Sequence, residues 1–199
     1  MAFLVTYRRT RRLSMRIVQN GDVHISAPIG TPRKTIERFI QSNREWIAEA
    51  CKKTAQRQQQ RNAFYDQLPL DTPAQRRSAA ERLHAIIDPI IAQHSREMGV
   101  HPGRITLRRT ISRWGSCNHR TRAISFSIYL LLLPDWCIEH VVVHELAHLI
   151  VPNHGPSFYG VMDRHFPNWR EARAETRRIS RNGSNGKAED SENGENDKE

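Results

Sequence analysis

The segment from Val141 to Val151 constrains the fold of this chain more than any other, because it places three ionisable side chains in an otherwise apolar run. These side chains are His144, Glu145 and His148. An apolar run is normally buried in a folded protein, and burial of ionisable groups costs free energy unless a partner compensates them. The segment therefore predicts a buried site at which the three side chains share a binding partner.

A helix best explains the spacing of the two histidines. Residues four apart lie one above the other on a helix, so that His144 and His148 can bind the same metal ion. Glu145 lies about 100° further round the helix, where its carboxylate can act on a water held by the metal. These are the parts of the HExxH zinc site, which combines two imidazole ligands, a glutamate base and an open coordination position.

Two other interpretations of this segment are weaker. Its three consecutive valines favour a strand, but a strand would send Glu145 to the face opposite the two histidines. Two unrelated core histidines at this spacing would leave the intervening glutamate buried without a reason. We therefore predict a zinc-binding helix with Glu145 as the general base.

A catalytic zinc commonly has three protein ligands, so a third ligand is expected outside the helix. Pro152 ends the helix, because proline lacks an amide hydrogen and disfavours helical geometry at the preceding residue. His154 follows this break, and Gly155 and Pro156 can turn the chain back toward the helix. We therefore expect His154 to complete the ligand set.

Three residues further along the chain are alternative third ligands. His165 is a histidine near the end of a short predicted helix. Glu171 and Glu175 could supply the downstream carboxylate that a second class of HExxH enzymes uses. Both glutamates could equally pair with neighbouring arginines at helical spacings.

The remaining sequence predicts an α+β fold. Short segments of alternating apolar residues predict strands, the first three of which form a small antiparallel meander; they are residues 3–7, 13–18 and 23–26, followed later by 105–109 and 123–129. Two threonine–proline pairs, Thr31-Pro32 and Thr72-Pro73, have the sequence of helix starts, and apolar residues at helical spacing follow each pair. We expect a small antiparallel sheet packed against helices, one of which is the HExxH helix.

One domain is expected to span residues 1–181, with an N-terminal part of strands and helices at 1–100 and a zinc-binding core at 101–181. Residues 187–199 contain six acidic residues and two lysines, and Ala188 is their one apolar residue. This composition predicts a disordered acidic tail, which we place at residues 182–199.

Residues 1–186 are strongly basic, with 29 lysines and arginines against 15 aspartates and glutamates. A surplus of this size favours contact with nucleic acid or another polyanion, and it is also typical of a soluble, arginine-rich surface. No nucleic-acid-binding motif accompanies the charge. Nucleic acid is therefore a candidate partner that rests on charge alone.

The N-terminus and the cysteines favour a cytoplasmic protein. Arg8 and Arg9 follow directly on the first apolar residues, so no signal peptide is expected, and no apolar run has the length of a membrane span. The three cysteines, Cys51, Cys117 and Cys137, are odd in number and widely spaced, which argues against a disulfide framework. The sequence does not predict the oligomeric state.

Four motifs taken together resemble the YgjP-like zinc metallopeptidase domain. They are Trp114-Gly115-Ser116-Cys117, His144-Glu145-Leu146-Ala147-His148, Asn153-His154-Gly155-Pro156-Ser157-Phe158 and Pro167-Asn168-Trp169. The similarity extends weakly through residues 8–46. The segment 154–158 also resembles the third-ligand segment of SprT-like proteases, which cut proteins bound to DNA. The resemblance implies a zincin-like fold with one zinc ion on His144, His148 and His154, and with Glu145 as the base.

Two interpretations of residues 114–117 remain open. As a signature of the resembled family, this turn could form a wall of the cleft beside the HExxH helix, where the predicted strand 123–129 would bind an extended substrate. Alternatively, it is a tight turn with Trp114 packed in the core. Cys117 could also be a nucleophile or an inhibitory zinc ligand, although the sequence indicates no partner for it.

The leading functional hypothesis is a zinc-dependent endopeptidase that hydrolyses a peptide or protein substrate through a metal-activated water. A first alternative is a nucleic-acid-associated module, in which the zinc is structural or the basic surface directs the chain to DNA or RNA. A second alternative is a metal-binding scaffold without catalysis, which a site closed by four protein ligands would favour.

Overall fold

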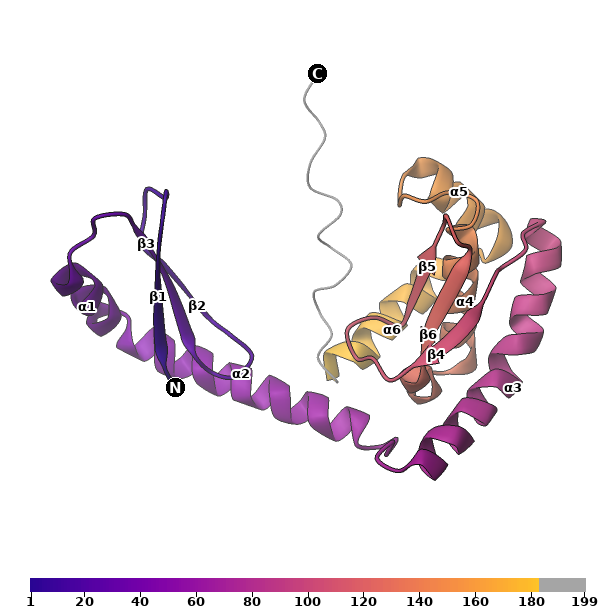
Figure 1. The fold of residues 1–199 in the computed structure, drawn as a ribbon, viewed down its shortest axis with the longest axis horizontal. Coiled ribbons are helices and arrows are strands. Elements are labelled where there is room, and N and C mark those ends of the chain that lie inside the picture. The colour runs from indigo at the N-terminus through magenta and orange to yellow at the C-terminus, as the bar shows by residue number, and fades with distance from the viewer. Residues whose placement is uncertain (183–199) are drawn as a thin grey trace, which may run out of the picture. The chain divides into compact units, whose positions relative to one another are not determined.

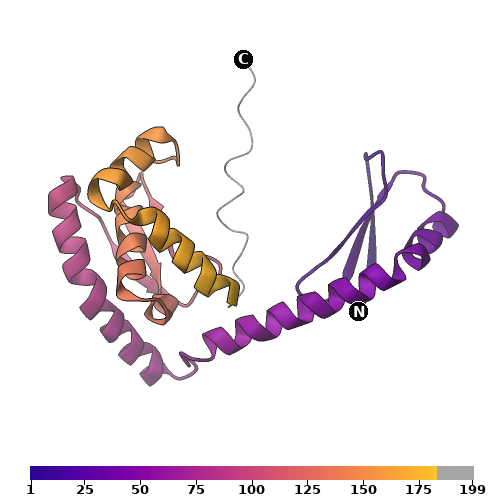
Figure 2. The same cartoon turned by 180° about the vertical axis from the view of Figure 1, so that it is seen from behind.

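The computed structural model describes residues 1–182, which divide into two compact units, Met1–Asn62 and Ala63 onward. Figures 1 and 2 show the two units from opposite sides. A single domain over residues 1–181 stays a prediction, because compactness of the parts does not decide whether they unfold together. Apart from Asn182, the acidic tail predicted for residues 182–199 lies outside the described residues.

The first unit contains a three-stranded sheet in the order β1-β3-β2. Its strands are β1 (Phe3–Arg8), β2 (Ser14–Ile17) and β3 (Val23–Pro28). β2 and β3 are antiparallel, but β1 is parallel to β3, with Val5 opposite Ile25. The predicted antiparallel meander is therefore wrong for β1. The alternation of apolar residues specifies which face of a strand is buried but not the direction in which the strand runs.

Two helices cover one face of this sheet, α1 (Arg33–Ser42) and α2 (Arg44–Tyr65). Ile36 of α1 and Ile47 of α2 are buried against the β3 side chains that point to the same face, Val23, Ile25 and Ala27. A helix start was expected at Thr31-Pro32, and α1 does begin there, but Thr31 is not its cap residue. Thr31 donates a hydrogen bond of 2.7 Å to the Pro28 carbonyl, and Pro32 occupies the cap position.

The second unit combines a three-stranded sheet with helices. Its elements are α3 (Pro73–Met98), β4 (Ile105–Arg108), β5 (Gly115–Asn118), β6 (Ala123–Ser127), the 3₁₀ helix η1 (Ile128–Leu132), α4 (Asp135–Ala147), α5 (Pro156–His165) and α6 (Trp169–Asn182). The sheet order is β4-β6-β5, with β4 parallel and β5 antiparallel to β6. The α+β class is confirmed, and both sheets are mixed.

The strands of the second sheet differ from those predicted from the sequence. Residues 115–118 form the strand β5, whereas a turn was expected there. β6 ends at Ser127 rather than Tyr129, and it is the central strand, so its backbone pairs with a neighbour on each side. The predicted strand 123–129 therefore cannot bind a substrate along its edge. β5 is the edge strand beside the HExxH helix and is in contact with it.

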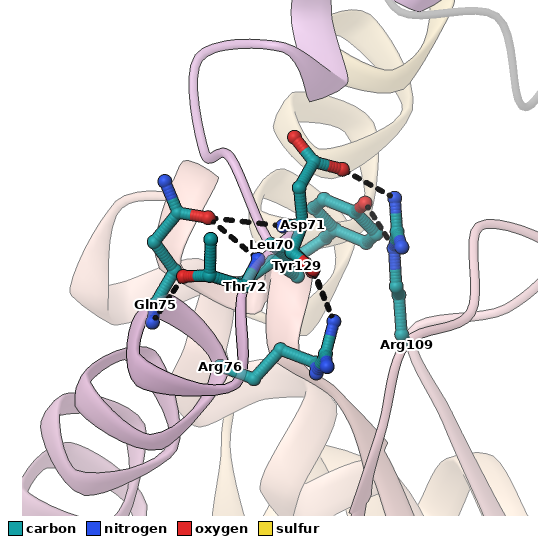
Figure 3. Close-up of polar contacts among 7 residues, drawn as sticks. All are labelled: Leu70, Asp71, Thr72, Gln75, Arg76, Arg109 and Tyr129. Atoms are coloured by element: carbon teal, nitrogen blue, oxygen red, sulfur yellow. Dashed lines mark hydrogen bonds and ion pairs between the residues drawn. The ribbon is translucent and has the colours of Figure 1, made fainter.

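The start of α3 is fixed by polar contacts that Figure 3 shows. Thr72 and Gln75 form a capping box, in which the Gln75 amide donates to Thr72 Oγ1 at 3.1 Å and the Thr72 amide donates to Gln75 Oε1 at 2.9 Å. Arg109, directly after β4, donates to the Tyr129 hydroxyl at 3.4 Å and lies 3.5 Å from Asp71. These bonds tie the beginning of α3 to β4 and η1. The helix ends at Gly99, whose positive φ of 64° is costly for other residues.

Helix α4 lies at the centre of the second unit, in contact with β5, α3, α5 and α6. Its apolar side chains are buried on several faces, with Ile138, Val142 and Leu146 packed in the same core as Ile87 of α3 and Phe126 of β6. This surrounding core holds the HExxH residues in fixed positions. Within residues 1–182, no helix combines the length and the apolar character needed to cross a membrane.

Candidate metal centre

Three histidine side chains converge where α4 ends. His144 lies in the last turn of α4, His148 is the C-cap residue of the helix, and His154 lies in the loop before α5. Nε2 of His144 lies 3.2 Å from Nε2 of His148 and 3.1 Å from Nε2 of His154. Candidate ligand atoms of all three residues lie within 4.8 Å of one another.

The geometry and chemistry of these side chains fit one zinc ion. Two nitrogen ligands on a tetrahedral zinc ion, at about 2.0–2.1 Å from the metal, lie about 3.3–3.4 Å apart, close to the separations seen here. A histidine ligand must also be neutral. Burial lowers the pKa of His144 well below its ordinary value, and the neighbouring His148, His140 and His154 lower it further. His144 therefore offers a free lone pair at neutral pH.

The chain reverses after α4 in the way that brings His154 back to the helix. The amide of Val151 donates to the Ala147 carbonyl at 2.9 Å, and the amide of Gly155 donates to the Asn153 carbonyl at 2.8 Å. Nδ1 of His148 lies 3.3 Å from the Val151 carbonyl, which orients Nε2 toward the other two histidines. The same turn thus places His154 and orients His148.

Phe158, in the first turn of α5, is a contact residue of the site that the spacing argument missed. Its side chain is 1% exposed, and its ring centroid lies 4.7–5.0 Å from those of all three histidines. The ring restricts the orientations that the imidazoles can adopt. Its position ten residues after His148 and just past the turn is the sequence signal that could have identified it, since an aromatic residue there must pack against the preceding helix.

Glu145 points from α4 toward the edge strand β5 and is 5% exposed. A Cβ atom built on Gly115 would lie 2.5 Å from Oε1 and 2.6 Å from Cγ of Glu145, closer than real Cβ contacts allow. Glycine is therefore required at position 115 so that the carboxylate can lie against the β5 backbone. The Gly115 of the family-like motif is thus explained by its contact with Glu145.

Cys117 lies on the same strand as Gly115, and its surroundings disfavour the thiolate. Burial raises the pKa of Cys117 to about 11, and the charge of Glu145 contributes to the increase. A thiol that stays protonated at neutral pH is a poor nucleophile and a poor metal ligand. These properties oppose the interpretation of Cys117 as a nucleophile and its interpretation as an inhibitory zinc ligand.

The alternative third ligands lie elsewhere in the second unit. Within residues 1–182, the group of His, Cys, Asp and Glu side chains that are close enough to share an ion consists of His144, His148 and His154. Glu175 forms an ion pair with Arg178 at 2.6 Å, and Glu171 is exposed on α6. His165 lies at the end of α5. The structure brings His154, and none of these three, to the HExxH pair.

Two further residues support the surroundings of the centre. His140 lies one turn before His144, with 6.0 Å between the ring centroids, and burial lowers the pKa of His140 to about 4. Trp114 is half-buried against the core, and its indole N–H donates to Ser180 of α6 at 3.2 Å. Trp114 thus anchors the start of β5, which is compatible with both interpretations of the 114–117 motif.

Comparison with known proteins identifies the family of this chain. The sequence matches the family model described as YgjP-like, metallopeptidase domain, over residues 11–71 and 71–179. Comparison with curated proteins gives no match. Solved structures with similarity include the metallopeptidase zymogen of Pyrococcus abyssi abylysin, with 18% identity, a TM-score of 0.43, and coverage of 46% of this chain and 92% of that chain. The metallopeptidase zymogen of Methanocaldococcus jannaschii jannalysin has 17% identity and a TM-score of 0.38, with coverage of 47% and 89%. Because the family model spans most of the sequence, the chain belongs to the YgjP-like metallopeptidase family.

Proposed function

We propose that this metallopeptidase is a zinc-dependent endopeptidase, in which His144, His148 and His154 bind one zinc ion and Glu145 is the general base. The observation that best supports the proposal is the convergence of three imidazole nitrogens, 3.1–3.2 Å apart, on the helix that carries Glu145. A structural zinc site commonly has four protein ligands, whereas a catalytic site has three. The three-residue group among the described residues favours catalysis over a scaffold.

The chemistry follows from the roles of these side chains. Zinc supplies Lewis acidity, which lowers the pKa of a water and polarises a substrate carbonyl. Glu145 accepts the proton of the attacking water on its carboxylate and later donates that proton to the leaving amine. Its burial between α4 and Gly115 holds the carboxylate in one orientation, so little reorganisation is needed before proton transfer.

The edge of β5 supports an extended peptide as substrate. β5 pairs with β6 on one side through residues Gly115 to Asn118, and the backbone groups on its other side can pair with an added strand. A peptide held through its backbone in this way need not end at the metal centre. This arrangement supports cleavage within a chain rather than removal of terminal residues.

The experiment that tests the general base is the substitution Glu145→Gln. We expect the variant to keep its zinc and to lose activity on a protein or peptide substrate by about 10²–10⁴-fold, the usual contribution of general acid–base catalysis. Zinc content is measured by elemental analysis of the same preparation. Glu171→Gln, an identical change at an exposed residue of α6, is the matched control. A zinc-loaded Glu145→Gln protein with the native rate would refute the proposal.

Endopeptidase activity requires a separate test. We expect cleavage of an internally quenched peptide whose amino and carboxyl ends are both blocked. If only peptides with a free terminus are cleaved, the enzyme is an exopeptidase.

We also propose that the chain acts in the reducing environment of the cytoplasm. Cys51, Cys117 and Cys137 are all free thiols in the structure, and free thiols are typical of that compartment. Mass spectrometry of the protein after rapid alkylation of cells would test this by measuring how many of the three thiols are reduced.

A further inference from the structure

The positive charge of the chain is concentrated in the first unit, which does not carry the metal centre. Residues 1–62 contain 13 lysines and arginines against four aspartates and glutamates, whereas residues 63–182 contain 16 against 11. The surplus of the whole chain is therefore mainly a property of one small unit. This distribution indicates a function that is separate from peptide hydrolysis.

Six of these cations lie at one end of the first sheet. The register places Arg8 opposite Pro28 and Ser14 opposite Ser26, so β1 and β3 end where β2 begins. The connection from β1 to β2 crosses this end (Figure 1), and from the same end β3 leads through residues 29–32 into α1. We call the six exposed side chains the basic end; they are Arg8, Arg9, Arg11, Arg12, Arg33 and Lys34.

The connection that carries four of these arginines has a defined conformation. Thr10 is half-buried, its hydroxyl donates to the Arg12 carbonyl at 2.8 Å, and its amide donates to the Arg8 carbonyl at 2.8 Å. The amide of Ile29, at the end of β3, also donates to the Arg8 carbonyl, at 3.2 Å. The backbone is thus held in place while the arginine side chains on either side of Thr10 extend into solvent.

This arrangement is electrostatically unfavourable in the isolated protein. Four arginines occur within five consecutive residues, and like charges at such distances repel. The first turn of α1 contains Arg33 and Lys34 and no acidic residue, the reverse of the preference set by the helix dipole. Within the described residues, the ion pair at the basic end joins Arg33 to Glu37 at 2.9 Å on the surface, and such a pair is worth little. An anionic partner would remove the repulsion.

The residue types indicate the kind of anion. Five of the six cations are arginines, whose planar guanidinium groups match the oxygens of a phosphate group. Tyr7 is the next-to-last residue of the β1 register at this end and is 51% exposed, so its ring is accessible to a nucleobase. A series of phosphates linked through sugars, each of which carries a flat aromatic base, is the chemistry of a nucleic-acid strand. A lipid surface offers phosphates without bases and would not use Tyr7 in this way.

We propose that the basic end of the first unit binds a nucleic acid through its phosphate backbone. This binding goes beyond peptide hydrolysis and does not depend on zinc. It would hold the metallopeptidase on a nucleic acid, where proteins associated with the same strand are at high local concentration.

The test measures binding of fluorescent oligonucleotides to the full-length protein by anisotropy over a range of salt concentrations. Probes are RNA and DNA of about 20 nucleotides, single-stranded and duplex, long enough to cover several phosphates. In the variant Arg8→Gln/Arg9→Gln/Arg11→Gln/Arg12→Gln we expect affinity to fall at least about tenfold. For a single strand, the slope of log affinity against log salt should become shallower by about 3, since each lost phosphate contact contributes about 0.7.

A matched control separates the site from net charge. Arg77→Gln/Arg82→Gln/Arg104→Gln/Arg108→Gln removes the same charge from exposed positions of the second unit, and we expect its affinity to stay within about twofold of the wild type. Replacement of the four first-unit arginines by lysine keeps the charge and should restore most of the binding. Peptide cleavage serves as the folding control and should be unchanged in every variant.

Four outcomes would overturn the proposal. One is no binding of any oligonucleotide by the wild type, and another is equal loss in both glutamine variants. A third is binding to vesicles that contain phosphatidylserine without binding to oligonucleotides. The fourth is oligonucleotide binding that occurs only after removal of residues 187–199, because the acidic tail would then be the partner of the basic end.

Discussion

At the scale of single residues, the contact between Gly115 and Glu145 is the most informative in the molecule. It connects a family-like motif on β5 with the proposed general base on α4, two segments about 30 residues apart in the sequence that only the fold brings together. The HExxH spacing predicted candidate ligands for a metal ion. It could not predict that the Glu145 carboxylate would lie against the neighbouring strand, where only a residue without a side chain, Gly115, leaves room for it.

The substitution Gly115→Ala tests this contact. The added methyl group would displace the Glu145 carboxylate, and a displacement of about 1 Å can reduce a rate by about 100-fold. We expect kcat to fall by about 10–100-fold, with zinc content unchanged, because no histidine is touched. Gly160→Ala is the matched control, since nothing lies within 4 Å of a Cβ at that position. A native kcat for Gly115→Ala would show that the carboxylate position does not matter.

His140 gives a pH dependence to the stability of the second unit. Its folded pKa of about 4 lies below the value of about 6.5 for an unfolded histidine. As the pH falls, the His140 imidazole therefore takes up a proton in the unfolded chain at a higher pH than in the folded chain. The free energy of unfolding decreases as the pH falls from the unfolded pKa toward the folded one. Between pH 7 and pH 5 this residue should account for a loss of about 2 kcal/mol.

The measurement compares the free energy of unfolding of wild type and His140→Gln in urea at pH 7 and pH 5. We expect the decrease between the two pH values to be smaller in the variant by about 2 kcal/mol. His84→Gln, at a histidine whose side chain is 44% exposed and paired with Asp88, serves as the control. An unchanged decrease in His140→Gln would contradict the assignment.

At the scale of elements, the strongest local signals in the sequence were the reliable ones. Pro152 and the apolar run before it predicted where α4 would lie, and the capping pair at Thr72 predicted the start of α3. β5 was missed because Gly115 to Asn118 have little intrinsic preference for strands. That strand exists because the next strand along the chain, β6, supplies its hydrogen-bond partners, as Ser116 opposite Ser125 illustrates. Backbone pairing of this kind needs no periodic pattern of apolar side chains.

The capping box offers a test of element stability that leaves the metal centre untouched. Thr72→Ala removes the hydroxyl that accepts the Gln75 amide, and we expect the free energy of unfolding to fall by about 1 kcal/mol. Thr72→Ser retains the acceptor and should restore most of the loss. Denaturant unfolding of the three proteins provides the comparison, and equal stability of the alanine variant would show that the cap contributes nothing.

At the scale of the whole molecule, the sequence predicted the class of the fold and left the arrangement of the strands open. Apolar spacing identified most helices and strands, but the parallel pairing of β1 with β3 depends on a crossover that includes β2. The division at Asn62 falls inside α2, where the helix continues without a glycine or proline that would indicate a boundary. The spacing of His144 and His148 on one helix predicted two members of the three-histidine group. The packing of Phe158 against all three imidazole rings was not predicted, because the spacing argument considered metal ligands alone.

Zinc should stabilise the unit that contains the three histidines. At about 1,000 times its Kd, a ligand bound only by the native state adds about 4 kcal/mol, which corresponds to roughly 10 °C in Tm. Calorimetry of the full-length protein with zinc and with a chelator measures this shift. His154→Ala should abolish most of it, and His101→Ala, an exposed histidine of the same unit, should not. A Tm that is insensitive to zinc would exclude tight binding by the native state.

The shortness of β5 has a consequence for substrate selection. An edge of four residues, Gly115–Asn118, can form a ladder only with a segment whose own backbone groups are unpaired. It would contact few side chains of that segment, so discrimination by amino-acid type would be weak. We expect such an enzyme to distinguish its targets by conformation: a folded protein would be resistant, and the same protein would become a substrate wherever a stretch of it has opened.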